Sequence, residues 1–345
     1  MQETNNRPLS TRWITTSDVG RCVSLINEVF SIKRTEAEYK WKFFDSPPRS
    51  AKVLIAEDTE TKALMGHYAV VPVFLNTSGE TILCCQSGDT AVHKDAEGKG
   101  LFARSATEAF KSLSEEGYSC VYGFPNANSY PGFARRLGWA RVGRLVRYRV
   151  LLKFRGVPLQ FWKLPMLTMR LKRMRQNNIA LAQCKVQCTV AIPEGINKLW
   201  NQVAPFEKFS LKKDQTYLDW RYSTNPICDY KYYSLVSEIG LLGLLIGRFE
   251  GRRFFITDLL VVRKDLAIGA YLVNSVLKKM LLSLDVDAIE FIGRDDGFFD
   301  AAFSNFNASP SSLIFCLRSF GDKVIPAQIE NAINWTVTLG DLDNS

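Results

Sequence analysis

The chain has 345 residues and a net charge of +9, with 46% hydrophobic and 23% charged residues. This is the composition of a soluble globular protein, and the length is sufficient for two hydrophobic cores. The longest apolar run, residues 241–246, is too short to cross a bilayer, and the N-terminus lacks the apolar core of a signal peptide. We therefore expect a cytoplasmic protein.

The cysteines predict no metal centre. Eight are present without a C-x-x-C pair, and the chain has only two histidines, so a zinc site lacks its usual ligands. Reduced, mostly buried thiols are the expected state. For the adjacent Cys84 and Cys85, no histidine or acid stands at a spacing that indicates a catalytic base, so both are interpreted as packing residues.

The first half of the chain predicts a mixed α/β order. Two helices are expected early, one starting at Ser17 and Asp18 and one over 35–44, which ends before Pro47 and Pro48 because proline cannot continue a helix. Strands are expected where apolar and β-branched residues run between turn-forming residues, over 11–15, 52–57, 64–75, 80–93 and 141–154.

Residues 88–117 carry the strongest local signal. A strand ending at Val92 leads into a turn with Gly98 and Gly100, and Leu101 opens a helix with one apolar face. Such a turn directs several backbone N–H groups at one point, where the helix dipole adds partial positive charge. This pattern is typical of a phosphate site. The alternative is that the glycines serve only the turn.

The order of strand, glycine turn, helix, strand and short helix resembles the GNAT superfamily of CoA-dependent acyltransferases. In that family the turn reads Q/R-x-x-G-x-G/A. Here Glu97 stands in the first position, Gly100 matches the first glycine, and Phe102 replaces the last small residue. The longer string over 87–102 looks most like GNAT proteins found among bacterial surface-polysaccharide genes.

The resemblance implies acyl-CoA as donor. Its pyrophosphate would lie on the amides of the glycine turn, and its pantetheine would run beside the strand that ends at Val92, like an added strand. The acyl group is then attacked directly by a bound amine. The residues implied in cofactor binding are Ala91, Val92, Gly98, Lys99, Gly100, Leu101, Phe102, Ala103 and Asn126.

The short helix is where family members often supply a tyrosine that protonates the departing thiolate. Asn126, Ser129 and Phe133 fall at the spacing of the family's N-x-x-A-x-x-x-Y pattern, so a phenylalanine occupies the tyrosine's place. Tyr130, one helical turn away, is our candidate donor. The alternative role of Tyr130 is packing against Pro131.

Two residues are candidates for the base that accepts the amine's proton. Asp89 lies just before the strand end, beside Gly88 and apolar residues, so we expect desolvation to raise its pKa. The alternative is that Asp89 caps a turn. His93 titrates in the right range, but its place after Val92 directs it toward the turn and solvent.

A basic stretch follows. Residues 117–193 contain fourteen Lys and Arg and no Asp or Glu. This predicts a positive field that attracts phosphates or anionic surfaces, or else a solvated linker face. The apolar and basic part, 161–175, is interpreted as an interdomain linker helix or as a segment lying on a membrane surface.

The second half repeats elements of the first. Residues 41–43 resemble 220–222 in sequence and in distance from a following proline, and 92–95 match 262–265 ahead of a helix. A recurring unit predicts a duplicated domain. The second turn has a single glycine, Gly269, no cation, and no Asn-led short helix after it, so we expect the chemistry in the first copy.

The expected organisation is therefore a GNAT-like domain over 1–155, a basic linker over 156–190, and a degenerate GNAT-like domain over 191–345. The expected function is CoA-dependent acyl transfer, most simply acetyl transfer, to a small-molecule amine such as an amino sugar or sugar nucleotide of polysaccharide synthesis. A noncatalytic acyl-CoA-binding module is the first alternative. Nucleic-acid binding is the second, although no recognised binding motif or stacking platform is present and no nucleic-acid partner is expected.

Overall fold

The computed structural model describes residues 8–125, 129–154, 157–283, 285–320 and 329–342. The chain forms two compact units that are each assembled from separate segments. The first comprises 1–74, 82–142 and 315–330, and the second comprises 75–81, 143–314 and 331–345. The continuous ranges expected from the sequence differ from this division, because a hairpin tip and a C-terminal segment are each grouped with the other half of the chain.

The elements of the first unit follow the order that the sequence predicts. Its strands are β1 (Leu9–Trp13), β2 (Lys52–Asp58), β3 (Leu64–Thr77), β4 (Glu80–Val92) and β5 (Cys120–Gly123). Its helices are α1 (Val19–Phe30), α2 (Glu36–Phe43), α3 (Leu101–Glu115) and α4 (Tyr130–Leu137). This order confirms the mixed α/β prediction.

The strands of the first unit neighbour one another in the order β1-β2-β3-β4-β5, and the end of β15 (Asn307–Ser319) pairs with β5. β5 is antiparallel to β15 and parallel to β4, at Cys85–Val121 and Gln86–Tyr122. β4 runs on to Val92 beyond this parallel register. A segment from the end of the chain therefore completes the sheet of the first unit.

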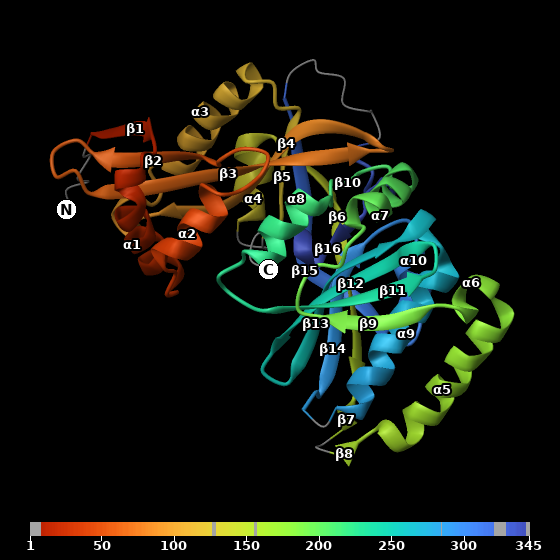
Figure 1. The fold of residues 1–345 in the computed structure, drawn as a ribbon. Coiled ribbons are helices and arrows are strands. Elements are labelled where there is room, and N and C mark those ends of the chain that lie inside the picture. The colour runs from red at the N-terminus through yellow and green to blue at the C-terminus, as the bar shows by residue number, and fades with distance from the viewer. Residues whose placement is uncertain (1–7, 126–128, 155–156, 284, 321–328, 343–345) are drawn as a thin grey trace. The chain divides into compact units, whose positions relative to one another are not determined.

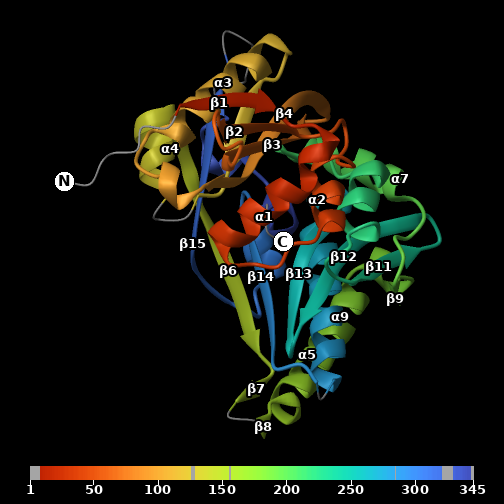
Figure 2. The ribbon, with the colours of Figure 1, turned by 90° about the vertical axis from the view of Figure 1, so that its left-hand side faces the viewer.

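Helices cover both faces of this sheet. Figures 1 and 2 show α1 and α2 on one face and α3 on the other. Neighbouring residues of β3 point to opposite faces, as strand geometry requires. The His67 ring contacts Tyr39 of α2, whereas the Tyr68 ring contacts Phe102 and Phe110 of α3. The buried residues of β3 therefore contribute to two cores, one on each face of the sheet.

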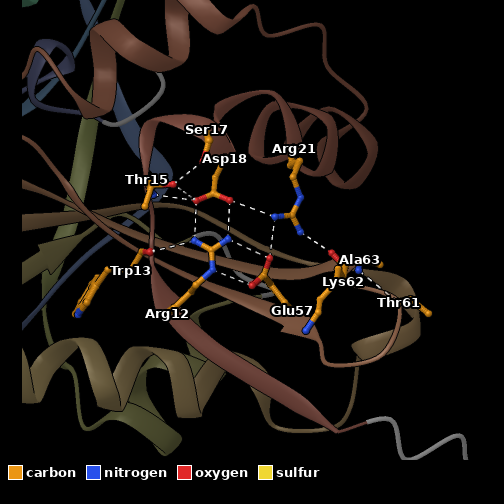
Figure 3. Close-up of polar contacts among 10 residues, drawn as sticks. All are labelled: Arg12, Trp13, Thr15, Ser17, Asp18, Arg21, Glu57, Thr61, Lys62 and Ala63. Atoms are coloured by element: carbon orange, nitrogen blue, oxygen red, sulfur yellow. Dashed lines mark hydrogen bonds and ion pairs between the residues drawn. The ribbon is translucent and has the colours of Figure 1, made fainter.

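An ion-pair network ties β1 to the start of α1 (Figure 3). Arg12 donates two hydrogen bonds of 2.7 Å to the carboxylate of Asp18 and two, of 2.8 and 3.1 Å, to that of Glu57. Arg21 pairs with Asp18 at 3.2 Å and with Glu57 at 2.8 Å. The hydrogen bonds from Arg12 hold the pKa of the buried Asp18 well below its usual range.

The second unit is a sheet with helices packed on it. The strands are β6 (Ala140–Leu151), β7 (Lys153–Phe154), β8 (Val157–Pro158), β9 (Lys185–Thr189), β10 (Ser210–Leu211), β11 (Tyr230–Ser237), β12 (Gly240–Glu250), β13 (Arg253–Val261), β14 (Ala288–Arg294) and β16 (Val337–Thr338). The helices are α5 (Gln160–Asn177), α6 (Ile179–Ala182), α7 (Ile196–Val203), α8 (Gln215–Leu218), α9 (Leu266–Leu282) and α10 (Phe298–Ala302). The main sheet runs β6-β14-β13-β12-β11-β9.

The segment expected to be a linker helix is α5, which belongs to the second unit and lies beside α9 (Figure 1). Its Leu167 and Leu171, one helical turn apart, are buried, whereas Met166 and Met169 are exposed. In the part of the chain that the structure describes, no helix is long and apolar enough to span a membrane.

The positive field expected over 117–193 is partly neutralised within the second unit. Arg147 and Arg149 approach the carboxylate of Glu290 at 3.9 and 3.3 Å, and Lys153 approaches Asp287 at 3.1 Å. These acids come from β14 and the turn before it, far along the chain. Tertiary pairing therefore supplies the negative charges that the stretch itself lacks.

Replacing Arg12 by leucine should lower the free energy of unfolding by about 2 kcal/mol, because the buried Asp18 loses its two 2.7 Å hydrogen bonds from Arg12 and retains the longer 3.2 Å ion pair with Arg21. We expect less than for a fully enclosed pair, since 40% of the Arg12 side chain is exposed. Urea unfolding measures the change. The control is Lys40→Ala, which removes an exposed pair with Glu36 and should shift stability by less than about 0.5 kcal/mol. Equal midpoints for both variants would contradict the role of the network.

Candidate functional site

The turn between β4 and α3 uses both of its glycines for backbone conformation. Gly98 has φ 72° and Gly100 has φ 71°, a left-handed region that residues with a Cβ rarely occupy. A Cβ added at either position would meet nothing within 4 Å, so the space above both backbones is open. Gly100 is the N-cap of α3 and brings no side chain to its end.

The first turn of α3 presents free backbone donors. The first hydrogen bond of the helix runs from the amide of Arg104 to the carbonyl of Gly100, at 3.1 Å. Among the described residues, the amides of Leu101, Phe102 and Ala103 donate to no protein acceptor. The helix dipole places partial positive charge at the same end. These donors are suited to an anionic oxygen, and a phosphate at this position stays a prediction from the sequence.

The start of α3 is held firmly against the sheet. Leu101 is buried with Met65 and Ala96, and Gly66 leaves the room that the Leu101 side chain fills. Phe102, which stands where the GNAT pattern has a small residue, directs its ring inward. Its centroid lies 6.2 Å from that of Tyr68 and 5.1 Å from that of Phe133. The aromatic ring is thus accommodated by packing.

Asp89 corrects an expectation from the sequence. It is buried, and its carboxylate contacts both Arg34 and Lys42, with Lys42 Nζ at 2.9 Å from Oδ2. Burial opposes ionisation, but the charges and hydrogen bonds of the two cations outweigh it and lower the pKa of Asp89 to about 2. The expectation of a raised pKa was wrong because Arg34 and Lys42 come from elsewhere in the chain. A carboxylate of this pKa is a weak base at neutral pH.

The backbone of Asp89 is also unusual. Asp89 has φ 45° within β4, and its carbonyl is 2.8 Å from Nδ1 of the buried His67. A carbonyl only accepts, so Nδ1 carries the proton in the neutral ring and Nε2 accepts from the hydroxyl of Tyr39, at 2.9 Å. The N–H of Thr90 lies across the same trans peptide and therefore points away from His67.

Sequence reasoning missed this group of residues. Arg34, Lys42, His67 and Tyr39 meet around Asp89, yet none was a candidate. Two signals could have indicated them. His67 is the one histidine within the largely apolar β3, and Lys42 stands between aromatic residues of α2. A polar residue in such a run must find a partner when it is buried.

The other base candidate, His93, lies at the turn as expected. Its Nδ1 accepts a hydrogen bond of 3.2 Å from the amide of Asp95, and its Nε2 lies 3.4 Å from a carboxylate oxygen of Glu28. The side chain is 19% exposed. Both ring nitrogens therefore have local partners, so His93 is not oriented by the structure as an open proton acceptor.

The remaining candidates fall on β4 and α4. Ala91 is buried, and Val92 packs against the cluster that seats Leu101, so only their backbones remain for a ligand. Lys99 is exposed on the turn. Tyr130 is half-buried and is the first residue of α4, three residues before the buried Phe133. Asn126 lies outside the described residues.

Two further features singled out in the sequence are the adjacent cysteines of β4 and the turn before α9 in the second unit. Cys84 and Cys85 are fully buried. In the second unit, α9 is capped by Asp265, whose carboxylate accepts from the amide of Ile268 at 2.9 Å. Gly269 lies against the Phe298 ring. The end of α9 is therefore occupied by the chain's own carboxylate, whereas the end of α3 is open.

Comparison with known proteins identifies the class of fold. Residues 10–142 match the model of the acetyltransferase (GNAT) domain family. This match spans β1 to the start of β6 and includes the glycine turn. The N-terminal part of the chain is therefore similar to a GNAT acetyltransferase domain. No curated protein matches the chain.

Solved structures with the same fold extend over most of the chain. A probable N-acyltransferase from Enterococcus faecalis V583 superposes with a TM-score of 0.63 at 13% identity, covering 91% of this chain and 73% of that one. A GCN5-related N-acetyltransferase from Anabaena variabilis gives 0.64 at 12% identity, with the same coverage. Saccharomyces cerevisiae N-myristoyltransferase with bound myristoyl-CoA gives 0.57 at 13%, covering 90% and 82%.

His67 should make stability depend on pH. Burial lowers its pKa to about 4, whereas the unfolded value is about 6.5. Below 6.5 the unfolded chain takes up a proton that the folded chain does not, so stability is lost as pH falls from 6.5 toward 4. At pH 5 the loss attributable to His67 is on the order of 2 kcal/mol.

The measurement is urea unfolding at pH 7.5 and pH 5 for the wild type and for His67→Gln. Glu207, whose pKa is raised to about 7 by burial, acts in the opposite direction but is present in both proteins, so their difference isolates His67. His93→Gln is the matched control, since it removes the only other histidine. An identical pH dependence in the wild type and His67→Gln would refute a neutral, buried imidazole.

Proposed function

We propose that the protein is an acyl-CoA-dependent N-acyltransferase, most simply an acetyltransferase. The observation that carries this proposal is the open end of α3, where a GNAT domain leaves three amides without acceptors behind two glycines in the left-handed region. Anionic oxygens of a pyrophosphate satisfy such donors. Acyl-CoA supplies the activated thioester on which the reaction depends.

We assign the binding of acyl-CoA and the steps of acyl transfer to the following groups of the chain. The amides of 101–103 and the backbone of Gly98 hold phosphate oxygens, with Lys99 adding a positive charge. The end of β4 lies beside the pantetheine, and the N–H of Thr90, oriented through His67 and Asp89, is the donor that polarises the thioester carbonyl. The amine attacks the acyl carbon, its proton leaves to a base, and the thiolate leaves with a proton from a donor, for which Tyr130 remains our candidate.

For the acceptor, we propose a small-molecule amine, with amino sugars and sugar nucleotides first. The resemblance of 87–102 to proteins of polysaccharide gene clusters supports this choice. A role in bacterial polysaccharide synthesis follows only if the acceptor is of this kind.

A noncatalytic acyl-CoA-binding module is the second candidate, and one observation favours it. Asp89 is held by two cations with a pKa of about 2, and both nitrogens of His93 have partners, so neither candidate base is poised to accept a proton. Phe133, at the place where family members often have a tyrosine, cannot donate a proton to the departing thiolate, which also favours a noncatalytic module. In this case the domain binds acyl-CoA without turnover.

We further propose that the two units arose by duplication, with division near 1–155, 156–190 and 191–345 in the ancestral chain. Both contain three strands, a short turn, a long helix and a strand parallel to the one before the helix: β4 with β5, and β13 with β14. Because the Asp265 carboxylate already accepts from the amide of Ile268 at the start of α9, only the first unit is expected to bind CoA.

Gly100→Val should abolish CoA binding, because a β-branched residue cannot hold the left-handed conformation and its Cβ enters the open space over the amides. Isothermal titration calorimetry with CoA measures this. Gly117→Val is the matched control, since Gly117 has φ 94° at the other end of α3 and carries the same strain. Wild-type affinity in Gly100→Val would remove the proposed cofactor site.

A mass-spectrometric screen tests turnover. Acetyl-CoA is incubated with simple amines and with UDP-, dTDP- and GDP-linked amino sugars, and each product gains one acetyl group. We expect acylation of at least one acceptor by the wild type and none by Gly100→Val. CoA binding without acylation of any acceptor would select the noncatalytic module.

A further inference from the structure

Two cations share one carboxylate oxygen beside β4. Arg34 Nη1 and Lys42 Nζ both contact Asp89 Oδ2, and the side chains of Arg34, Lys42 and Asp89 are 12%, 8% and 6% exposed. The three charged side chains thus meet at one oxygen atom while all are largely shielded from solvent. Desolvating cations costs free energy, and groups of this kind are enriched where a protein binds a charged partner.

Arg34 is held in place through its backbone. Its N–H donates to Oδ1 of Asn27 at 2.7 Å, and its carbonyl accepts from Nδ2 of the same side chain at 2.9 Å. Asn27 lies on α1, so the amide clamps the segment between α1 and α2 to the helix before it. With the backbone clamped at one end and Asp89 at the other, the guanidinium has little freedom.

Most donors of this guanidinium are unused. A guanidinium carries five N–H groups, and Arg34 directs one of its terminal nitrogens to Asp89. Its Nε and Nη2 find no acceptor within the described part of the chain, and neither is among the enclosed unpaired polar atoms. These N–H groups therefore reach space that solvent can enter, although the side chain as a whole is largely buried.

The chemistry of such a group is specific. A fixed, planar guanidinium with two free N–H directions binds a carboxylate or a phosphate through parallel hydrogen bonds, and a neighbouring ammonium strengthens the attraction. The position is equally informative. Asp89 lies three residues before Val92, about 10 Å along the strand from the end of β4 that leads to the glycine turn. An anion at Arg34 is thus near the strand on which we place the donor thioester.

We propose that Arg34, clamped by Asn27 and Asp89 and assisted by Lys42, binds the anionic group of the acceptor. This inference rests on the proposed acyl transfer and narrows its substrates to amines that also carry a carboxylate or a phosphate. Asp89 is then a positioning residue for the two cations and not the base.

Matched acceptor pairs test the proposal with acetyl-CoA as donor. Glucosamine is compared with glucosamine 1-phosphate, and glycinamide with glycine, so that each pair differs in one anionic group. We expect the wild type to favour the anionic member of one pair in kcat/KM by roughly tenfold or more. The pair that shows the preference identifies phosphate or carboxylate as the recognised group.

Three variants locate the effect. Arg34→Gln should bring the preference close to unity. The change should appear mainly in KM, because the variant loses a contact that binds the acceptor but keeps the groups that act on the reacting atoms. Arg34→Lys keeps the charge without the planar fork and should retain part of the preference. Lys33→Gln removes the same charge from the exposed neighbouring residue and should leave the preference intact. An equal preference in the wild type and Arg34→Gln, or none in the wild type, overturns the proposal.

Calorimetry separates this inference from the acyl transfer itself. If CoA binds but no amine is acylated, glucosamine 1-phosphate and glycine are titrated directly into the CoA-loaded wild type and Arg34→Gln, and binding by the wild type alone upholds the anion site. If CoA does not bind, glucosamine 1-phosphate and glycine are titrated into the same two proteins without CoA, and binding by the wild type alone again upholds the anion site. A loss of CoA affinity in Arg34→Gln, with a wild-type melting temperature, would assign Arg34 to the cofactor and overturn the proposal. If Arg34→Gln does not fold, Arg34→Lys carries the comparison.

Discussion

In the first unit, the packing of β4 against β3 and the segment around α2 depends on two groups of Asp89, its side-chain carboxylate and its backbone carbonyl. The carboxylate binds Arg34 and Lys42, and the carbonyl accepts from the imidazole of His67. These contacts join the segment around α2, strand β3 and strand β4 at a single buried point. The backbone of Asp89 is in the left-handed region, which costs about 1–3 kcal/mol for a residue with a Cβ, so the surrounding contacts must maintain it.

The constraint at Asp89 has a consequence for function. A strand with regular dihedrals directs successive N–H groups alternately to its two neighbours. A left-handed residue interrupts that alternation, and the hydrogen bond to His67 fixes the direction of the peptide that follows. His67 is itself fixed by Tyr39, so the peptide between Asp89 and Thr90 is oriented by buried side chains. Rigid support of this kind is what a stabilising hydrogen-bond donor requires.

The two units show how the same local pattern can be open or closed. Both place a helix after a strand and a short turn, but α3 begins at a glycine and α9 begins after an aspartate. The Asp265 carboxylate meets the amide that an external anion would otherwise meet. One residue type at the N-cap therefore separates a potential anion site from a self-satisfied helix end.

The sequence by itself determined the elements and the glycine turn. The apolar periodicity of α1 and α3, the prolines after α2 and the turn residues between strands act within short windows, so they predicted the order that the structure has. Gly98 and Gly100 were also readable, because a left-handed turn ahead of an amphipathic helix requires residues without a Cβ.

Only the tertiary structure decided the electrostatic state of the site. Flanking residues suggested that desolvation raises the pKa of Asp89, but Arg34 and Lys42 reach it from 55 and 47 residues away and reverse the sign. The basic stretch was likewise paired with Glu290 and Asp287 of a distant strand and turn. The physical reason is that backbone conformation follows from neighbours in sequence, whereas charge interactions follow distance in space, which the folded chain alone defines.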